Sequence, residues 1–142
     1  MKPEMLIRFH LGFEWRNYVE EINKNVFHNV SFRKNQRAII NATLFNKDIF
    51  ALMPTGYGKS LCFQLSSQIS HGLTIVICPL IALIYDQVHQ MKLIGVHAEG
   101  LHSGEKTISK LNEILNNKLD AKLIYTTPET ILIPQVLNLI FK

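Results

Sequence analysis

Hydrophobic residues in the first half of the chain recur at helical spacing, with one short strand-like run among them. The first helical stripe comprises Trp15, Val19, Ile22 and Val26, at i, i+4, i+7 and i+11. A second helix is predicted over residues 35–45, and after a turn residues 48–52 read as a buried strand. A third helix is predicted over residues 60–70, with one apolar face formed by Leu61, Leu65 and Ile69.

The second half alternates strands and helices more regularly. Strands are predicted over residues 73–78, 98–101 and 122–125, the first of them buried on both faces. The helical stripes between them are Leu80, Ile84, Val88 and Met91, then Ile108, Leu111, Leu115 and Leu119. Thr127 and Pro128 are typical of the N-cap and first turn of a last helix. The alternation predicts an α/β fold with a parallel sheet and ligands at the carboxyl ends of the strands.

Composition bounds the class of protein. With 142 residues, 47% hydrophobic, and no low-complexity linker, the chain suits one core. A net charge of +4 is compatible with a polyanionic partner but does not establish one. Cys62 and Cys78 lack metal-ligand spacing and so do the six histidines, so we expect buried thiols, a reduced compartment and no zinc. Neither a secretory signal nor a bilayer-length apolar stretch is seen, and we expect an intracellular protein without membrane partners.

The candidate chemistry lies in the glycine-rich stretch from Met53 to Ser60, between the strand at 48–52 and the helix at 60–70. Its predicted nucleotide-binding residues are Thr55, Gly56, Tyr57, Gly58, Lys59 and Ser60. The two glycines let backbone amides approach phosphates, the lysine is the candidate catalytic cation at the β- and γ-phosphates, and the serine hydroxyl is the candidate Mg²⁺ ligand. The alternative is an ordinary strand-to-helix turn, since Met53 stands where the generic pattern has glycine.

Several short motifs follow in a fixed order along residues 13–130. They are Phe27, Phe32-Arg33, Gln36, the stretch 53–64, Pro79-Leu80-Ile81, Asp86-Gln87 and Tyr125-Thr126-Thr127-Pro128-Glu129. In this order they resemble the RecQ family of superfamily 2 DNA helicases, and the phosphate loop is similar to that of Werner-type members. The resemblance implies a RecA-like domain over residues 31–142 after an N-terminal helical segment over 1–30. It also implies ATP and Mg²⁺ as cofactors, DNA as partner, 3′-to-5′ unwinding in DNA repair and recombination, and a nuclear location.

The resemblance assigns roles to residues outside the phosphate loop. Gln36 corresponds to the family's adenine-reading glutamine, and Arg33 would lie flat on the base. Pro79, Leu80, Thr126, Thr127, Pro128 and Glu129 correspond to contacts with single-stranded or duplex DNA. His102-Ser103-Gly104 is similar in place to a further backbone-contacting loop. Judged on the residues alone, Arg33 and Gln36 could cap a helix, and the DNA segments could be plain strand-to-helix turns.

The chain also departs from the family. His28, Tyr57 and Ala82 stand where other members commonly have different residues. At position 82 the common residue is serine, and the absence of its hydroxyl would weaken one DNA contact by roughly 1 kcal/mol. No Asp-Glu dipeptide occurs, and no acidic residue follows Glu129. Without the carboxylate pair and the second motor's arginines, we expect no hydrolysis by this chain alone.

The chain is therefore expected to be the front part of a motor, with a sheet incomplete at its C-terminal side. Uncovered strand edges would then leave it only marginally stable. The alternative is a short module that binds nucleotide or DNA without hydrolysis. A generic kinase or GTPase would need an acceptor-binding or base-reading motif, and none is found.

Overall fold

A computed structural model describes residues 14–102, 104 and 106–141, without the side chains of 14–16. The chain divides into two compact units, Met1–His71 and Gly72–Lys142. None of the helices in the described ranges combines the length and apolar character needed to cross a membrane.

The described part of the first unit, residues 14–71, forms three helices around one apolar core. They are α2 (Glu14–Asn25), α3 (Gln36–Leu44) and α4 (Lys59–Ile69). The buried core consists of Val19, Ile22, Ile40, Leu44, Cys62 and Leu65, with Val26, Leu61 and Ile69 packed against it. The three predicted helices are thus confirmed, and so is the stripe from Val19 to Val26, while the side chain of Trp15 lies outside the described part. Helix α2 packs into the same core as α3 and α4, which lie beyond residue 30. The domain boundary expected after residue 30 stays a prediction.

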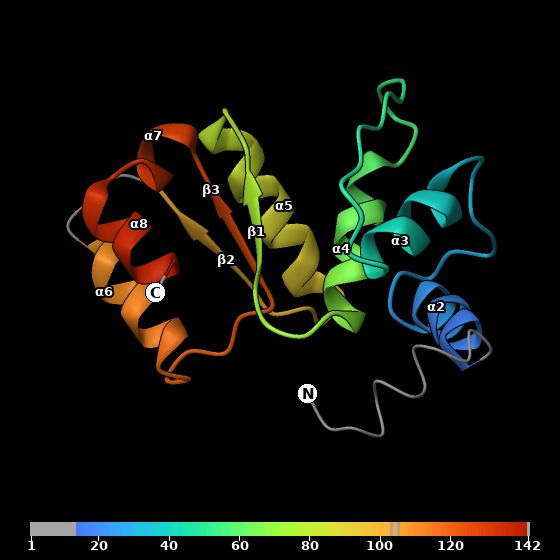
Figure 1. The fold of residues 1–142 in the computed structure, drawn as a ribbon, viewed down its shortest axis with the longest axis horizontal. Coiled ribbons are helices and arrows are strands. Elements are labelled where there is room, and N and C mark those ends of the chain that lie inside the picture. The colour runs from blue at the N-terminus through green and yellow to red at the C-terminus, as the bar shows by residue number, and fades with distance from the viewer. Residues whose placement is uncertain (1–13, 103, 105, 142) are drawn as a thin grey trace. The chain divides into compact units, whose positions relative to one another are not determined.

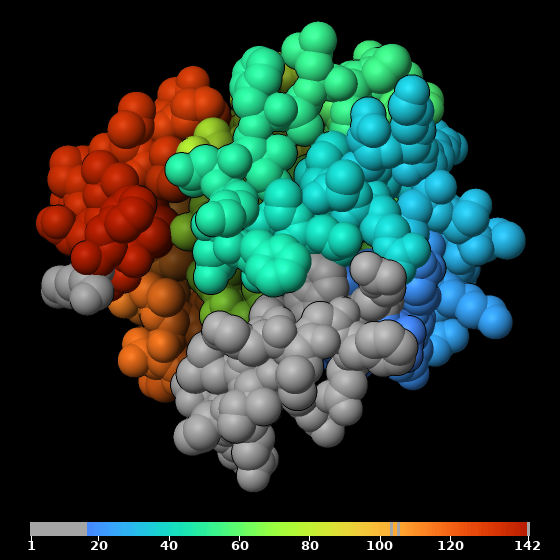
Figure 2. Space-filling model, turned by 45° about the vertical axis from the view of Figure 1, so that its right-hand side comes forward, coloured from blue at the N-terminus to red at the C-terminus, as the bar shows by residue number. Residues whose placement is uncertain are grey.

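The strand predicted over residues 48–52 is wrong for this structure. Residues 48–52 form no helix or strand and belong to the long loop that connects α3 and α4 (Figure 1). Phe50 and Leu52 are 93% and 88% exposed, and the segment lies uncovered on the face shown in Figure 2. A strand is stable only when its backbone groups pair with a neighbour, and no strand in the described residues pairs with this segment.

The second unit alternates strands and helices as predicted. Its elements are β1 (Thr74–Ile77), α5 (Ile81–Leu93), β2 (Ala98–Leu101), α6 (Lys106–Leu115), β3 (Leu123–Thr126), α7 (Pro128–Ile131) and α8 (Pro134–Ile140). The sheet order is β1-β3-β2, and both pairings are parallel. Figure 1 shows the three strands side by side with helices flanking them. The predicted α/β class with a parallel sheet is confirmed.

The core of this unit lies on both faces of the central strand β3. Leu101 and Ile124 pack with Leu111, Ile114 and Val136 from α6 and α8, and α5 contacts β2 and β3. All four residues of β3 are buried, as expected for a parallel strand covered on both faces.

Four details of the prediction for this unit are wrong. Leu80, predicted on the apolar stripe of α5, is the N-cap of that helix and is 63% exposed. The outer strand β1 is only partly buried, and Ile77 is 55% exposed, because β1 pairs with just one strand, β3, among the residues that the structure describes. Leu115 is 41% exposed while Ile114 takes its place in the core. The last helix divides into α7 and α8, since Pro134 has no amide to continue the hydrogen-bond ladder and starts a new helix.

Candidate nucleotide and strand-contact sites

The phosphate loop takes a backbone conformation that two of its glycines make possible. Gly56 and Gly58 have φ of 76° and 79°, in the left-handed region, and Gly58 is the N-cap of α4. A Cβ atom at Gly58 would lie 2.4 Å from Nε2 of Gln36, whereas one at Gly56 would meet nothing within 4 Å. Gly58 is thus required for its conformation and for the approach of Gln36.

Gln36 and Arg33 tie the start of α3 to the loop. Nε2 of Gln36 donates to the carbonyl of Gly58 at 3.0 Å, and Oε1 accepts from the amide of Arg33 at 2.7 Å. The guanidinium of Arg33 donates to the carbonyl of Gly56 and lies 6.0 Å from the centroid of the Tyr57 ring. The residues predicted for the base and for the phosphates are therefore brought together within the first unit.

The amide of Gln36 keeps part of its hydrogen-bonding capacity. A glutamine side chain offers two N–H donors and two acceptor lone pairs, and the contacts above occupy one of each. Gln36 is only 3% exposed, so a base could reach its remaining N–H donor and acceptor lone pair only through a small opening. Its reading of adenine stays a prediction.

Lys59 lies back over the loop that precedes it. Its Nζ donates to the carbonyl oxygens of Met53 and Pro54 at 2.9 and 3.0 Å. The ammonium stays exposed, and phosphate charges would compete with these two neutral acceptors. Ser60 lies half-buried in the first turn of α4, which carries no acidic residue to offset the positive end of the helix dipole.

The hydrogen-bond donors and the hydroxyl group of the phosphate loop are of the kinds that bind a magnesium triphosphate. Thr55 and Tyr57 are exposed on a turn whose glycines and helix N-terminus can present amides to phosphates. Among the described residues, no group of three or more His, Cys, Asp or Glu could hold a metal ion by itself. A single hydroxyl such as that of Ser60 suits Mg²⁺ that takes its other ligands from phosphates and water.

The two cysteines are packing residues. Both are free and buried, as predicted from their isolation in the sequence. Burial raises the pKa of the Cys62 thiol and outweighs a backbone hydrogen bond that lowers it. The thiol therefore stays neutral in the core beside the phosphate loop.

The residues assigned to DNA gather at the carboxyl edge of the second unit's sheet. Strand register aligns Ile77, Thr126 and Leu101, and the chain continues from them into the predicted contact segments. The amide of Cys78 donates to the carbonyl of Thr126 at 2.8 Å, which fixes the turn that carries Pro79 and Leu80. The structure thus brings these residues to one edge, and their contact with DNA stays a prediction.

Exposure separates these residues into two groups. Pro79, Leu80 and Glu129 are exposed and Pro128 is half-buried. Thr126 and Thr127 are 2% and 4% exposed, and Oγ1 of Thr127 caps α7 by accepting from the amide of Thr130 at 3.2 Å. The two threonine hydroxyls therefore face the protein, which leaves backbone groups and the exposed side chains for any contact with a strand.

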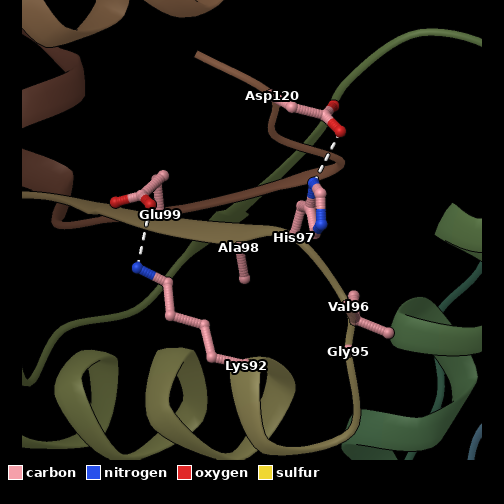
Figure 3. A pocket seen from close by; sticks show the side chains of 7 residues that line it. All are labelled: Lys92, Gly95, Val96, His97, Ala98, Glu99 and Asp120. Carbon is pink, nitrogen blue, oxygen red and sulfur yellow. Dashed lines mark hydrogen bonds and ion pairs between the residues drawn. The ribbon is translucent and has the colours of Figure 1, made fainter.

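A pocket of about 290 Å³ lies at the opposite, amino-terminal end of β2 (Figure 3). It is lined by Lys92, Gly95, Val96, His97, Ala98, Glu99 and Asp120. Lys92 reaches from α5 to Glu99 at 2.8 Å, Lys110 also pairs with Glu99, and Nδ1 of His97 pairs with Asp120. Six of these seven residues lie within the stretch 92–99, and only Asp120 comes from a distant segment.

Comparison with known proteins agrees with this geometry. Residues 33–138 match the DEAD/DEAH box helicase family. ATP-dependent DNA helicase Q-like 4B of Arabidopsis thaliana is 44% identical over 122 residues, which cover 84% of this chain and 11% of that protein. ATP-dependent DNA helicase Q1 of Mus musculus is also 44% identical, over 84% of this chain and 19% of its own length.

A bacterial relative shows the same pattern. ATP-dependent DNA helicase RecQ of Haemophilus influenzae is 40% identical over 119 residues, which cover 82% of this chain and 19% of that protein. The chain thus spans between a tenth and a fifth of the length of these relatives. A parallel sheet flanked by helices is consistent with a RecA-like helicase domain. The chain belongs to the DEAD/DEAH box helicase family, and its similarity there is to the RecQ-type helicases.

Proposed function

We propose that this chain is the ATP-binding part of a RecQ-type DNA helicase that unwinds DNA in the 3′-to-5′ direction. The observation that carries the proposal is the bonding of Arg33 and Gln36 to the carbonyls of Gly56 and Gly58. These contacts hold two glycines in the left-handed conformation directly before α4, with Lys59 at its first position. Amides, an ammonium and a hydroxyl then converge where a polyphosphate can lie.

The assigned roles follow from the chemistry of each group. Lys59 would leave the carbonyls of Met53 and Pro54 for the β- and γ-phosphates, where one pair of unit charges at ~4 Å is worth about 4 kcal/mol at an effective dielectric of ~20. Ser60 would ligate Mg²⁺, which supplies charge neutralisation when bound. Gln36 and Arg33 would receive the adenine, because they already border the loop.

We expect binding without turnover from these residues alone. Phosphoryl transfer depends on charges placed around the transferred group, including a carboxylate that orients the attacking water. No Asp-Glu dipeptide occurs in the sequence to supply it. The helicase activity, the DNA substrate, a role in repair and recombination and a nuclear location are therefore proposed for the longer protein to which these residues would belong.

Nucleotide binding is the direct test. Titration of the purified chain with a fluorescent ATP analogue and Mg²⁺ should give saturable binding that Lys59→Ala weakens at least about a hundred-fold, since the charge pair above is lost. Lys47→Ala is the matched control, because it removes an exposed lysine from the same unit outside the phosphate loop. Equal affinity of the Lys59→Ala variant would refute the assigned site.

The metal role can be tested on the same preparation. Ser60→Ala should lower affinity in the presence of Mg²⁺ and leave it unchanged in EDTA, because only the metal-dependent part passes through the hydroxyl. Equal losses with and without Mg²⁺ would assign the serine to phosphate binding or to folding instead. A DNA-stimulated ATPase assay should show no turnover above the Lys59→Ala background. Clear ATP hydrolysis would contradict the proposal that these residues bind ATP without hydrolysing it.

A further inference from the structure

We propose that Tyr85 and His102 form a stacking platform for an unpaired nucleobase, an inference that rests on the proposed DNA-binding function. Their ring centroids lie 5.1 Å apart, and the rings are tilted by 51°. Tyr85 is 59% exposed, so its side chain is accessible to a ligand, and His102 is half-buried. Bases of any sequence have a flat π-face, and an exposed tyrosine ring offers a matching surface.

The pair is held in place from two elements. The carbonyl of His102 accepts from Oγ1 of Thr107 at 2.6 Å, directly after Leu101 pairs in register with Thr126. On the other side, Tyr85 follows Ile84, which is fully buried in α5. Because these contacts fix the backbone on which both rings stand, stacking on them does not require the backbone to be ordered first.

Gly100 sets the distance between the two elements. A Cβ atom there would lie 3.1 Å from Cγ2 of Ile84 and 4.0 Å from Cδ2 of His102. A side chain at this position would require Ile84 to shift by a few tenths of an ångström. The absence of a side chain at Gly100 therefore favours the close approach of α5 and β2, the two elements next to the rings.

The surroundings favour a base over a phosphate. Ile81 lies one turn before Tyr85 on the same side of α5 and is 44% exposed. Leu80, which precedes Ile81 at the carboxyl edge of the sheet, is 63% exposed. Residues 72–142 carry as many acidic as basic side chains, so this unit has no net charge with which to attract phosphates. Stacking and apolar contact are therefore the contributions that the side chains of this edge can make, in addition to any contact from its backbone groups.

The test measures binding of fluorescein-labelled oligo-dT to the 142-residue chain by fluorescence anisotropy. Tyr85→Ala should weaken binding at least about five-fold, the lower end for loss of one stacked base, whereas Tyr85→Phe should stay within about two-fold. Tyr18→Ala removes an exposed tyrosine from α2 in the other unit and should leave the affinity unchanged. Far-UV circular dichroism of each variant checks that the fold is kept.

A strand whose bases are replaced by abasic sites separates stacking from backbone contact. The wild type and Tyr85→Ala should bind this strand equally, because the lost interaction requires a base. Equal binding of oligo-dT by Tyr85→Ala and wild type, or the same fold loss on both strands, would overturn the platform alone. If the wild type binds the ATP analogue but no strand, the DNA half of the proposed function fails and the platform fails with it.

Discussion

The segment 48–52 and the strand β3 are both short, mainly apolar runs, yet they differ in structure. The hydrophobic pattern predicts both as strands. All four residues of β3 are buried between β1 and β2, whereas Phe50 and Leu52 in the other segment are almost fully exposed. The composition of a run therefore indicates that it can be a strand, and only the neighbours decide whether it becomes one.

The two regions are also stabilised by different forces. The phosphate loop after residue 52 is held by side chains that donate to its carbonyls, from Arg33, Gln36 and Lys59. The sheet of the second unit is held by apolar burial around Ile124 and its neighbours. Such burial contributes about 25 cal/mol per Å², while hydrogen bonds in an open loop contribute little net stability. We therefore expect the loop to be the part that rearranges and the sheet to be the rigid support.

The largest expected effect compares one deletion of apolar side-chain atoms in each region. Ile124→Ala should lower the free energy of unfolding by about 2–5 kcal/mol, because Ile124 is 1% exposed and a cavity would remain. Phe50→Ala should change it by less than about 0.5 kcal/mol, since Phe50 is 93% exposed. Urea unfolding followed by circular dichroism measures both. A large cost at Phe50 would mean that the segment is covered in solution and would remove the contrast.

The next effect lies within the phosphate loop. Gly58→Ala and Gly56→Ala both force alanine into a left-handed conformation, at a cost of roughly 1–2 kcal/mol each. Only Gly58→Ala also displaces the buried amide of Gln36, which should add about 1–3 kcal/mol. The difference between the two variants in urea unfolding thus isolates the contact with Gln36. Equal costs would show that Gln36 moves away freely and does not hold the loop.

What the sequence could predict depends on the range of the interaction. Helix positions and the glycine-rich turn follow from local spacing, and they were found within a few residues. The contact from Gln36 to Gly58 joins residues that are 22 apart, so no periodic pattern reports it. The resemblance placed Gln36 at the base, and its bonds to the loop emerged only from the structure.

Packing choices on one helix also escape the sequence. Ile114 and Leu115 are adjacent and equally apolar, yet Ile114 is 6% exposed and Leu115 is 41% exposed. The 3.6-residue period tolerates either residue on the buried face, and the angle at which α6 meets the sheet decides between them. The contact between Tyr85 and His102 has no local sequence signal for a related reason, since only the packing of α5 on β2 brings the two rings together. The resemblance named His102 in a backbone-contacting loop and gave Tyr85 no role.

A smaller effect distinguishes two neighbouring threonines at the end of β3. Thr127→Val should cost about 1–2 kcal/mol, because it removes the oxygen that caps the amide of Thr130. Thr126→Val should be neutral or stabilising, because Oγ1 of Thr126 is buried without a hydrogen-bond partner among the described residues. Thermal unfolding of the two variants provides the measurement. Destabilisation by Thr126→Val would indicate a hydrogen bond to buried water at this edge.

The smallest effect concerns Glu99 at the amino-terminal end of β2. Burial alone would raise its pKa, but hydrogen bonds and charge from Lys110 and Lys92 outweigh this, and the net pKa is lowered. A carboxyl group with a lowered pKa in the folded state stabilises the protein fully above its pKa in the unfolded chain. That contribution falls as the pH drops below this value and is lost once the pH passes below the folded pKa.

Glu99→Gln should therefore cost up to about 1 kcal/mol at pH 7, as expected for a partly exposed ion-pair network. The difference from the wild type should shrink in acid and disappear below the lowered pKa. Glu113→Gln is the control, because Glu113 contacts only the hydroxyl of Ser109 at 3.3 Å among its described side-chain interactions. Urea unfolding at a series of pH values gives the two curves. If Glu99→Gln lowered the free energy of unfolding equally at all pH values, Glu99 would act through its shape in β2. The ion pairs with Lys92 and Lys110 would then contribute nothing to the stability of the sheet.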